Sequence, residues 1–116
     1  MTTSTIFNIK RNDTSKNIEC TLKINNVAVD NLGLATGVKF IMRLAAKKNA
    51  APKVAAAAII DDPVLYPGAV HYEWGTGDTD TAGTYSAEWE VTYSGGGVAT
   101  FPDDGYLTVN VVADLG

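Results

Sequence analysis

Apolar and polar residues alternate with a period of two along several stretches of the chain. The longest stretch, YSAEWEVTY at residues 85–93, places an aromatic or aliphatic residue at every odd-numbered position. This alternation is typical of β-strands with one buried face, because successive side chains of a strand point to opposite faces. Gly, Asn, Asp and Pro separate most of the stretches, as turns require. With the opening TIFNIK included, the pattern predicts strands over residues 5–10, 18–24, 38–44, 70–74, 85–93 and 107–113.

The alanine-rich segment LAAKKNAAPKVAAAAII, residues 44–60, has a composition that favours helix. Pro52 lies in its middle, however, where proline removes a backbone donor and clashes with the preceding turn. We therefore predict a hairpin with a loop over residues 45–52 and a return strand over 53–61. The turn at Ser94–Gly97 predicts one more short strand at 98–101. Together these segments predict an all-β fold, a β-sandwich of seven to eight antiparallel strands.

The length of 116 residues suits one domain with a single core, so residues 1–116 are expected to fold together. Apolar residues make up 46% of the chain and charged residues 19%, which is a globular composition. No apolar run approaches the roughly 20 residues that span a bilayer. The polar start MTTSTIFNIKRND does not resemble a signal peptide. We therefore expect no membrane partner.

Charge is divided unevenly between the two halves of the chain. The net charge of −4 argues against a nucleic-acid partner, which requires a basic face. Residues 1–58 hold all nine Lys and Arg with three acids, a net +6, whereas residues 59–116 hold ten acids and no base. Either the two sets meet inside the monomer, or a basic face of one copy meets an acidic face of the next. On the second alternative, the candidate interaction surface comprises Arg43, Lys47, Lys48, Asp61, Asp62, Asp103, Asp104 and the aromatic Tyr66.

The inventory of reactive residues argues against an enzyme, a metal site or a cofactor. One Cys (Cys20) and one His (His71) cannot build a disulfide within the chain or a His-based zinc site. Asp78 and Asp80 lie in a Gly-rich loop that suits calcium, but no further acids follow at a calcium-loop spacing, and we favour a turn. Cys20 has no base expected on its face of the sheet. The pairs 61–62 and 103–104 are expected in solvated turns and not as a glycosidase pair.

Aromatic side chains leave a sugar-binding alternative open, because exposed Tyr and Trp stack on sugars. Tyr72 and Trp74 lie at alternating positions expected to face the core. Tyr66, between Leu65 and Pro67, is the best candidate for an exposed aromatic, and Tyr106 is another to consider.

The stretch DTAGTY, residues 80–85, resembles the entry to strand F of immunoglobulin-like domains. The resemblance implies that Tyr85 forms a tyrosine corner, its hydroxyl bonding to backbone upstream. Ala87 occupies the place of the second disulfide cysteine of antibody domains, and Cys20 the place of the first, so half of that bridge is missing. A lone thiol then behaves as a small apolar group and suits a reducing compartment. The corner and core residues expected on this basis are Asp80, Tyr85, Cys20, Ala87, Trp89, Trp74 and Phe40.

The order of several short motifs resembles a more specific family, the immunoglobulin-like N-terminal domain of baseplate upper proteins of tailed phages. The motifs are FNIKRNDT (7–14), VKFIMR (38–43), GAVHYEW (68–74), DTDTAGTY (78–85), AEWEVTY (87–93) and TFPDDGY (100–106).

The resemblance implies a non-enzymatic structural protein of the virion, made and assembled in the host cytoplasm. It would act as a tail or baseplate assembly module, as a homo-oligomer that also contacts other virion proteins. The alternatives are a carbohydrate-binding host-attachment module and a head-decoration or head–tail joining protein of the same fold. Residues 2–10 are expected either to form the first strand of their own sheet or to be donated to a neighbour.

Overall fold

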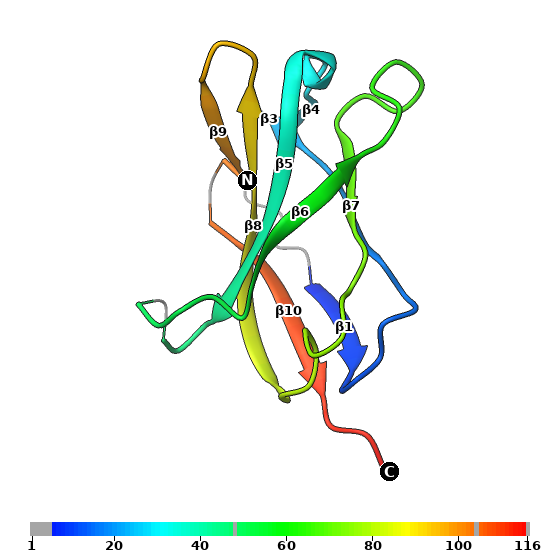
Figure 1. Ribbon diagram of the computed structural model, residues 1–116, viewed down its shortest axis with the longest axis vertical. Helices are drawn as coiled ribbons and strands as arrows, with labels where there is room; N and C mark the ends of the chain where they lie inside the picture. Colours follow the sequence, from blue (N-terminus) through cyan, green and yellow to red (C-terminus); the bar gives the residue numbers. More distant parts are fainter. Residues whose placement is uncertain (1–5, 48, 104, 116) are drawn as a thin grey trace.

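Strands make up almost all of the regular structure in residues 6–47, 49–103 and 105–115, the parts that the computed structural model describes (Figure 1). The strands are β1 (Ile6–Lys10), β2 (Ile18–Thr21), β3 (Lys23–Ile24), β4 (Val27–Ala28), β5 (Ala35–Leu44), β6 (Val54–Ile60), β7 (Ala69–Tyr72), β8 (Gly83–Tyr93), β9 (Val98–Phe101) and β10 (Leu107–Val112). A 3-10 helix, η1, covers Leu32–Leu34. The all-β fold class is therefore confirmed. No helix in these ranges has the length and apolar composition to cross a membrane.

The alanine-rich segment forms a strand, as Pro52 led us to expect. β6 pairs antiparallel with β5, from Val38 opposite Ala58 to Met42 opposite Val54. In the connecting loop the Arg43 guanidinium donates a hydrogen bond to the Ala50 carbonyl. Tertiary pairing thus overrides the helical propensity of alanine.

The strands follow the order β1-β10-β8-β5-β6-β7-β2, with β9 added to the free part of β8 beyond β10. β6 joins the two layers, because its first five residues pair with β5 and its last two, Ile59 and Ile60, pair with β7. One layer therefore contains β1, β10, β9, β8 and β5, and the other contains β7 and β2. β6 crosses diagonally between them in Figure 1.

One pair of strands departs from the antiparallel expectation. β1 runs parallel to β10, from Ile6 opposite Thr108 to Lys10 opposite Val112. Nearly the whole chain lies between the two strands, so no tight turn forces them to run in opposite directions. Residues 6–10 therefore form an edge strand of their own sheet, and the remainder of the segment considered for donation, residues 2–5, lies outside the described ranges.

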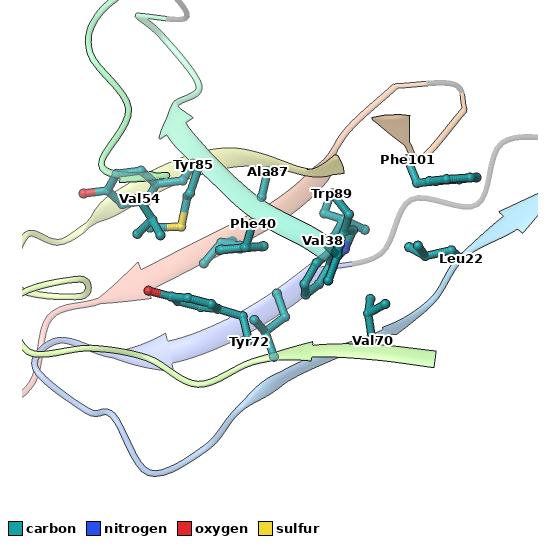
Figure 2. Packing of buried hydrophobic residues seen from close by; sticks show 14 of the residues in the cluster. Leu22, Val38, Phe40, Val54, Val70, Tyr72, Tyr85, Ala87, Trp89 and Phe101 are labelled. Atoms are coloured by element: carbon teal, nitrogen blue, oxygen red, sulfur yellow. The ribbon is translucent and has the colours of Figure 1, made fainter. Parts of the chain in front are cut away.

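Aromatic rings pack in the space between the layers, among them those of Phe40, Tyr72 and Trp89 (Figure 2). Phe40 of β5 stacks on Tyr72 of β7 with ring centroids 5.0 Å apart, and meets Trp89 of β8 at 4.8 Å. Trp74 contacts both Phe40 and Tyr72 edge-on. Burial confirms the expected core positions of these residues and of Ala87: Phe40, Tyr72, Trp74, Ala87 and Trp89 are all buried.

Tyr85 forms the hydrogen bond expected of a tyrosine corner. Its ring is buried and its hydroxyl donates to the carbonyl of Thr81, four residues upstream, at 2.7 Å. Burial raises the pKa of Tyr85, and the charges of Lys53 and Asp80 modify that effect only secondarily. Asp80, which we expected in the corner itself, is instead exposed and forms an ion pair with Lys53. The Asp80 carboxylate is drawn away from the tyrosine hydroxyl by its own partners, since it binds the Lys53 ammonium and accepts a hydrogen bond from the Thr81 hydroxyl.

Replacing Tyr85 with Phe is expected to lower the free energy of unfolding by about 1–2 kcal/mol, since the Thr81 carbonyl loses its donor in a buried site. Urea unfolding of Tyr85→Phe and of Tyr66→Phe, whose ring is exposed, measures the difference. An equal and small effect of both substitutions would contradict a stabilising role for the Tyr85 hydroxyl.

Candidate interaction surface

Large apolar side chains are exposed at one end of the sandwich, the upper end in Figure 1. There the β3–β4 hairpin, η1 and the connection between β6 and β7 lie together. Six large apolar residues on these segments are at least half exposed. We call this group the apolar end; it consists of Ile24, Val27, Leu34, Val64, Leu65 and Tyr66. Exposed apolar residues gathered in one region of a soluble domain mark an interaction site.

The most exposed part of the apolar end is a single helical turn after β6. The Asp62 carboxylate accepts hydrogen bonds from the backbone N–H groups of Val64 (2.9 Å) and Leu65 (3.1 Å). The Tyr66 N–H donates to the Asp62 carbonyl at 2.8 Å. Asp followed by Pro63 is a favourable start for such a turn, since proline suits the first helical position and the acid caps the free N–H groups. The turn therefore holds Val64, Leu65 and Tyr66 outward, with 84%, 69% and 61% of each residue exposed.

The end of this turn is packed against β2 and the β3–β4 hairpin. The Gly68 carbonyl accepts a hydrogen bond from Leu22 N–H, and the Leu22 carbonyl accepts one from Val29 N–H. Gly68 has a positive φ of 81°, and a Cβ there would lie 2.8 Å from the Leu22 carbonyl oxygen. Only glycine fits this close approach. The turn that carries the exposed apolar residues is therefore held in place by close backbone packing at Gly68.

An open pocket of about 490 Å³ lies beside Tyr66. Its lining combines one exposed aromatic ring, a hydroxyl and two carboxylates, from the residues Thr21, Asp61, Asp62, Tyr66, Pro67 and Ala69. Because Asp62 caps the turn and Asp61 contacts His71, both carboxylates already have partners within the chain.

His71 is placed between carboxylates on the outer face of β7. Its Nδ1 lies 2.7 Å from Asp61 and its Nε2 lies 3.3 Å from Glu73. Glu19 occupies the register position opposite His71 on β2. Burial lowers the pKa of His71, but its hydrogen bonds to the two carboxylates, together with their negative charges, raise it more, so the net pKa lies above its ordinary value. When His71 is protonated, it therefore links β7 to Asp61, which follows β6, and to Glu73, which follows β7.

The structure does not bring the charged candidates together into one face. Arg43 and Lys47 lie at the β5–β6 loop, whereas Asp61 and Asp62 follow the opposite end of β6. Asp103 is exposed in the connection between β9 and β10. Arg43 and Asp61 are only half-exposed and bind within the chain. Lys48 and Asp104 lie outside the described residues. Of the described residues of the proposed surface, Tyr66 belongs to the apolar end, and Asp61 and Asp62 lie next to it in the chain.

Among the described residues, two ion pairs join the basic first half of the chain to the acidic second half. Arg11 Nη2 lies 3.0 Å from Asp114, and Lys53 contacts Asp80. For these residues the charges meet inside the monomer, which was the first of the two alternatives.

The loop that suggested calcium is built as a turn. Asp78 accepts hydrogen bonds from the Tyr72 hydroxyl (2.6 Å) and from Gly75 N–H (2.7 Å). Burial raises the pKa of Tyr72, and Asp78 raises it further, so the hydroxyl remains a donor. Within the described residues, no group of three or more His, Cys, Asp or Glu side chains is placed to bind a metal.

Cys20 is half-buried at the margin of the core, beside Trp89. Burial raises the pKa of its thiol, more than the Trp89 indole N–H and the charge of Lys23 lower it. The thiol is therefore held protonated, which does not suit a nucleophile.

Comparison with protein-family models, curated proteins and solved structures gives no match.

Val64 and Leu65 were not among the residues singled out from the sequence. Both are apolar and follow a strand, so their pattern suggests burial. The signal that distinguishes them is the Asp62–Pro63 pair directly before them, which predicts the start of a helical turn and interrupts the strand.

Replacing Asp62 with Ala is expected to destabilise the protein by about 1 kcal/mol, because the turn loses its capping acceptor. Asp62→Asn keeps a side-chain oxygen in the same place and is expected to retain most of the stability. Thermal and urea unfolding compare the two variants. Equal losses in both would show that the negative charge, and not the cap, stabilises the turn.

Stability is expected to decrease as pH rises through the pKa of folded His71. Since that pKa is raised on folding, the contribution is fully present below the unfolded value near 6.5 and is lost above the folded value. Urea unfolding of the wild type and of His71→Gln between about pH 5.5 and 8.5 isolates the contribution. The difference between the two proteins should shrink toward high pH. A difference that does not change with pH would contradict it.

Proposed function

We propose that this protein is a non-enzymatic structural component of a phage virion, an assembly module of the tail or baseplate. It acts in repeated copies through protein–protein contacts and needs no cofactor. The short motifs that resemble those of the baseplate upper proteins support the virion assignment. The all-β fold and the hydrogen bond of Tyr85 are compatible with their immunoglobulin-like domain.

The observation that carries the contact function is the rigid display of Val64, Leu65 and Tyr66. Exposing three large apolar side chains to water is unfavourable. Binding of a partner that covers them is therefore stabilised by the hydrophobic effect. The Asp62 cap and the Gly68 packing fix the turn in advance, so little conformational entropy is lost on docking. Tyrosine at the centre of such a contact is a frequent source of binding energy.

A sugar-binding host-attachment role is the second candidate. The pocket that combines the Tyr66 ring with Thr21 and two carboxylates favours it, since aromatic stacking beside polar groups is suited to sugars. Burial of Tyr72 and Trp74 counts against it, because both rings are occupied in the core. A head-decoration or head–tail joining role would use the same apolar contacts at another place on the particle.

Leu65→Ser combined with Tyr66→Ser is expected to reduce incorporation into particles at least tenfold, since the double variant removes most of the apolar contact. Val112→Ser, at an exposed apolar position on β10 away from the apolar end, is the matched control and should incorporate normally. Each variant is supplied from a plasmid to cells that carry the phage genome with its own copy of the gene deleted. The amount of the variant in purified particles is measured by immunoblotting.

Immunogold labelling of the same particles distinguishes the locations, with label at the tail tip expected. Label on the head would support the head-decoration alternative. Absence of the wild-type protein from purified particles would overturn the proposal, and glycan binding that is lost in the double variant would favour the sugar-binding role.

A further inference from the structure

The loop between β5 and β6 lies at the opposite end of β6 from the apolar end. β6 runs from this loop to the connection that carries Val64, Leu65 and Tyr66, and it spans about 20 Å. In Figure 1 the loop projects at the lower left and the connection at the upper right. The loop of one molecule therefore does not reach the apolar end of the same molecule.

The loop is shaped by its own hydrogen bonds. Lys47 N–H donates to the Leu44 carbonyl at 3.1 Å, and Ala50 N–H donates to the Lys47 carbonyl at 3.0 Å. From β5, the Arg43 guanidinium donates to the Ala50 carbonyl. These bonds form two successive turns, so the loop loses little conformational entropy when it binds a partner.

The surface of this loop is basic and apolar. Residues 31–60 include five bases and no acid. Lys53 contacts Asp80, whereas the Lys47 ammonium is exposed and has no ion-pair or hydrogen-bond partner among the described residues. Three exposed alanines accompany it in the loop: Ala46, Ala50 and Ala51.

The apolar end offers the opposite charge. Asp61 and Asp62 line the open pocket beside Tyr66, and none of the lining residues is basic. Each carboxylate is engaged through Oδ1, by His71 in the case of Asp61 and by two backbone N–H groups in the case of Asp62. Neither Oδ2 has a hydrogen-bond partner in the part of the chain that the structure describes. Two carboxylate oxygens therefore remain available to a cation.

A lysine side chain is complementary to this pocket. Its methylene stem can pack on the Tyr66 ring and on Pro67, while its ammonium binds the carboxylates. Alanines beside such a lysine are small enough to approach Val64 and Leu65 closely. The β5–β6 loop combines these two features.

We propose that the apolar end of one copy binds the β5–β6 loop of the next copy, with Lys47 in the pocket beside Tyr66 and Ala50 against Leu65. The inference rests on the proposed contact function, because it names the partner that covers the apolar end. A contact between two apolar ends is disfavoured, since it would bring the carboxylates of Asp61 and Asp62 from both copies together.

The two surfaces are different, so the contact is heterologous. Each copy that binds through its loop still has a free pocket, and the assembly grows head to tail beyond two copies into a ring or a filament. The location of the basic and acidic candidates at opposite ends of β6 is the arrangement that such a contact needs.

The first experiment blocks each surface separately. Lys47→Glu reverses the charge on the loop and leaves the pocket intact. Thr21→Lys adds an ammonium to the pocket lining, where it occupies the carboxylates, and leaves the loop intact. The matched controls are Lys39→Glu on β5 and Thr100→Lys on β9, the same substitutions at exposed positions outside both surfaces. Circular dichroism verifies that the four variants are folded.

Sedimentation velocity up to about 0.5 mM protein measures the assembly. The wild type and both controls are expected to form species larger than dimers, and each blocked variant alone to associate at least tenfold more weakly. An equimolar mixture of the two blocked variants should form a heterodimer and no larger species, because it contains one intact loop and one intact pocket. Raising ionic strength from about 0.05 to 0.5 M should weaken wild-type assembly severalfold.

A wild type that stays monomeric, or that stops at a dimer, would overturn the inference. Assembly of either blocked variant at wild-type strength would overturn it as well, and so would a mixture of the blocked variants that contains no heterodimer.

The second experiment tests the contact without changing a charge. In a Cys20→Ser background, Ala50→Cys and Leu65→Cys in the same chain place one thiol on each surface. Mild oxidation should link each copy to the next and give a ladder of dimers, trimers and larger species on non-reducing gels. Ala57→Cys with Leu65→Cys is the matched control, because Ala57 is exposed on β6 outside the loop, and it should remain unlinked. Cross-linked dimers alone, no ladder, or equal ladders in both proteins would contradict the head-to-tail contact.

The particle experiment separates a failure of this inference from a failure of the proposed function. If incorporation into particles depends on Leu65 and Tyr66 but purified copies do not associate head to tail, the apolar end binds a different virion protein. The inference then fails while the proposed function stands. Absence of the wild-type protein from particles would instead overturn the proposed function, and head-to-tail association measured in solution would be unaffected by it.

Discussion

The stacking of Phe40 on Tyr72 holds the two layers of the sandwich together. Phe40 belongs to the layer of β5 and β8, and Tyr72 to the layer of β7 and β2, so their contact spans the interior. Trp74 and Trp89 enclose the pair from either layer. The buried hydroxyl of Tyr72 is satisfied by Asp78, so the same ring that anchors the core also fixes the loop that follows β7. Removing a large ring from such a core leaves a cavity that its neighbours fill only partly.

The form of the surface follows from the way β6 connects these layers. β6 pairs first with β5 and then with β7, and so closes one side of the sandwich. The connection that follows β6 lies at the end of the sandwich shown at the top of Figure 1. There the Asp62 carboxylate caps the start of the turn, and the Gly68 carbonyl accepts a hydrogen bond from Leu22 N–H, directly after β2. The crossing also separates β6 from β7 over Val54–Ala58, so that among the described strands these residues pair with β5 alone. The position of the apolar end thus follows from this change of strand partner.

The period-two pattern of the sequence was sufficient to predict most strands, because burial on one face imposes that period directly. Pro52 correctly decided between helix and strand for the alanine-rich segment, and Tyr85 has the hydrogen bond that its local motif implies. The parallel pairing of β1 could not be predicted, since it depends on residues far away in the chain. Asp80 was misplaced for a similar reason: its partner, Lys53, comes from the β5–β6 loop.

The candidate surface was less predictable than the core. Tyr66 was identified because it lies between Leu65 and Pro67, but the exposure of Val64 depends on how the turn packs on the rest of the domain. The division of charge between the two halves was visible in the composition. Composition does not determine which charges meet, because that is set by strand order. Arg11 reaches Asp114 only because β1 lies beside β10.

The neighbourhood of β1 and β10 also has a consequence for the order of events during biosynthesis. Asn8 and Asn110, hydrogen-bonded across the pair, are 102 positions apart. β1 therefore leaves the ribosome long before its partner is translated, and it has no hydrogen-bonded neighbour until β10 emerges. Contacts between distant segments make folding slow, and an unpaired strand is exposed to aggregation meanwhile. Docking of β1 onto its strand partner therefore cannot begin before β10 has been synthesised.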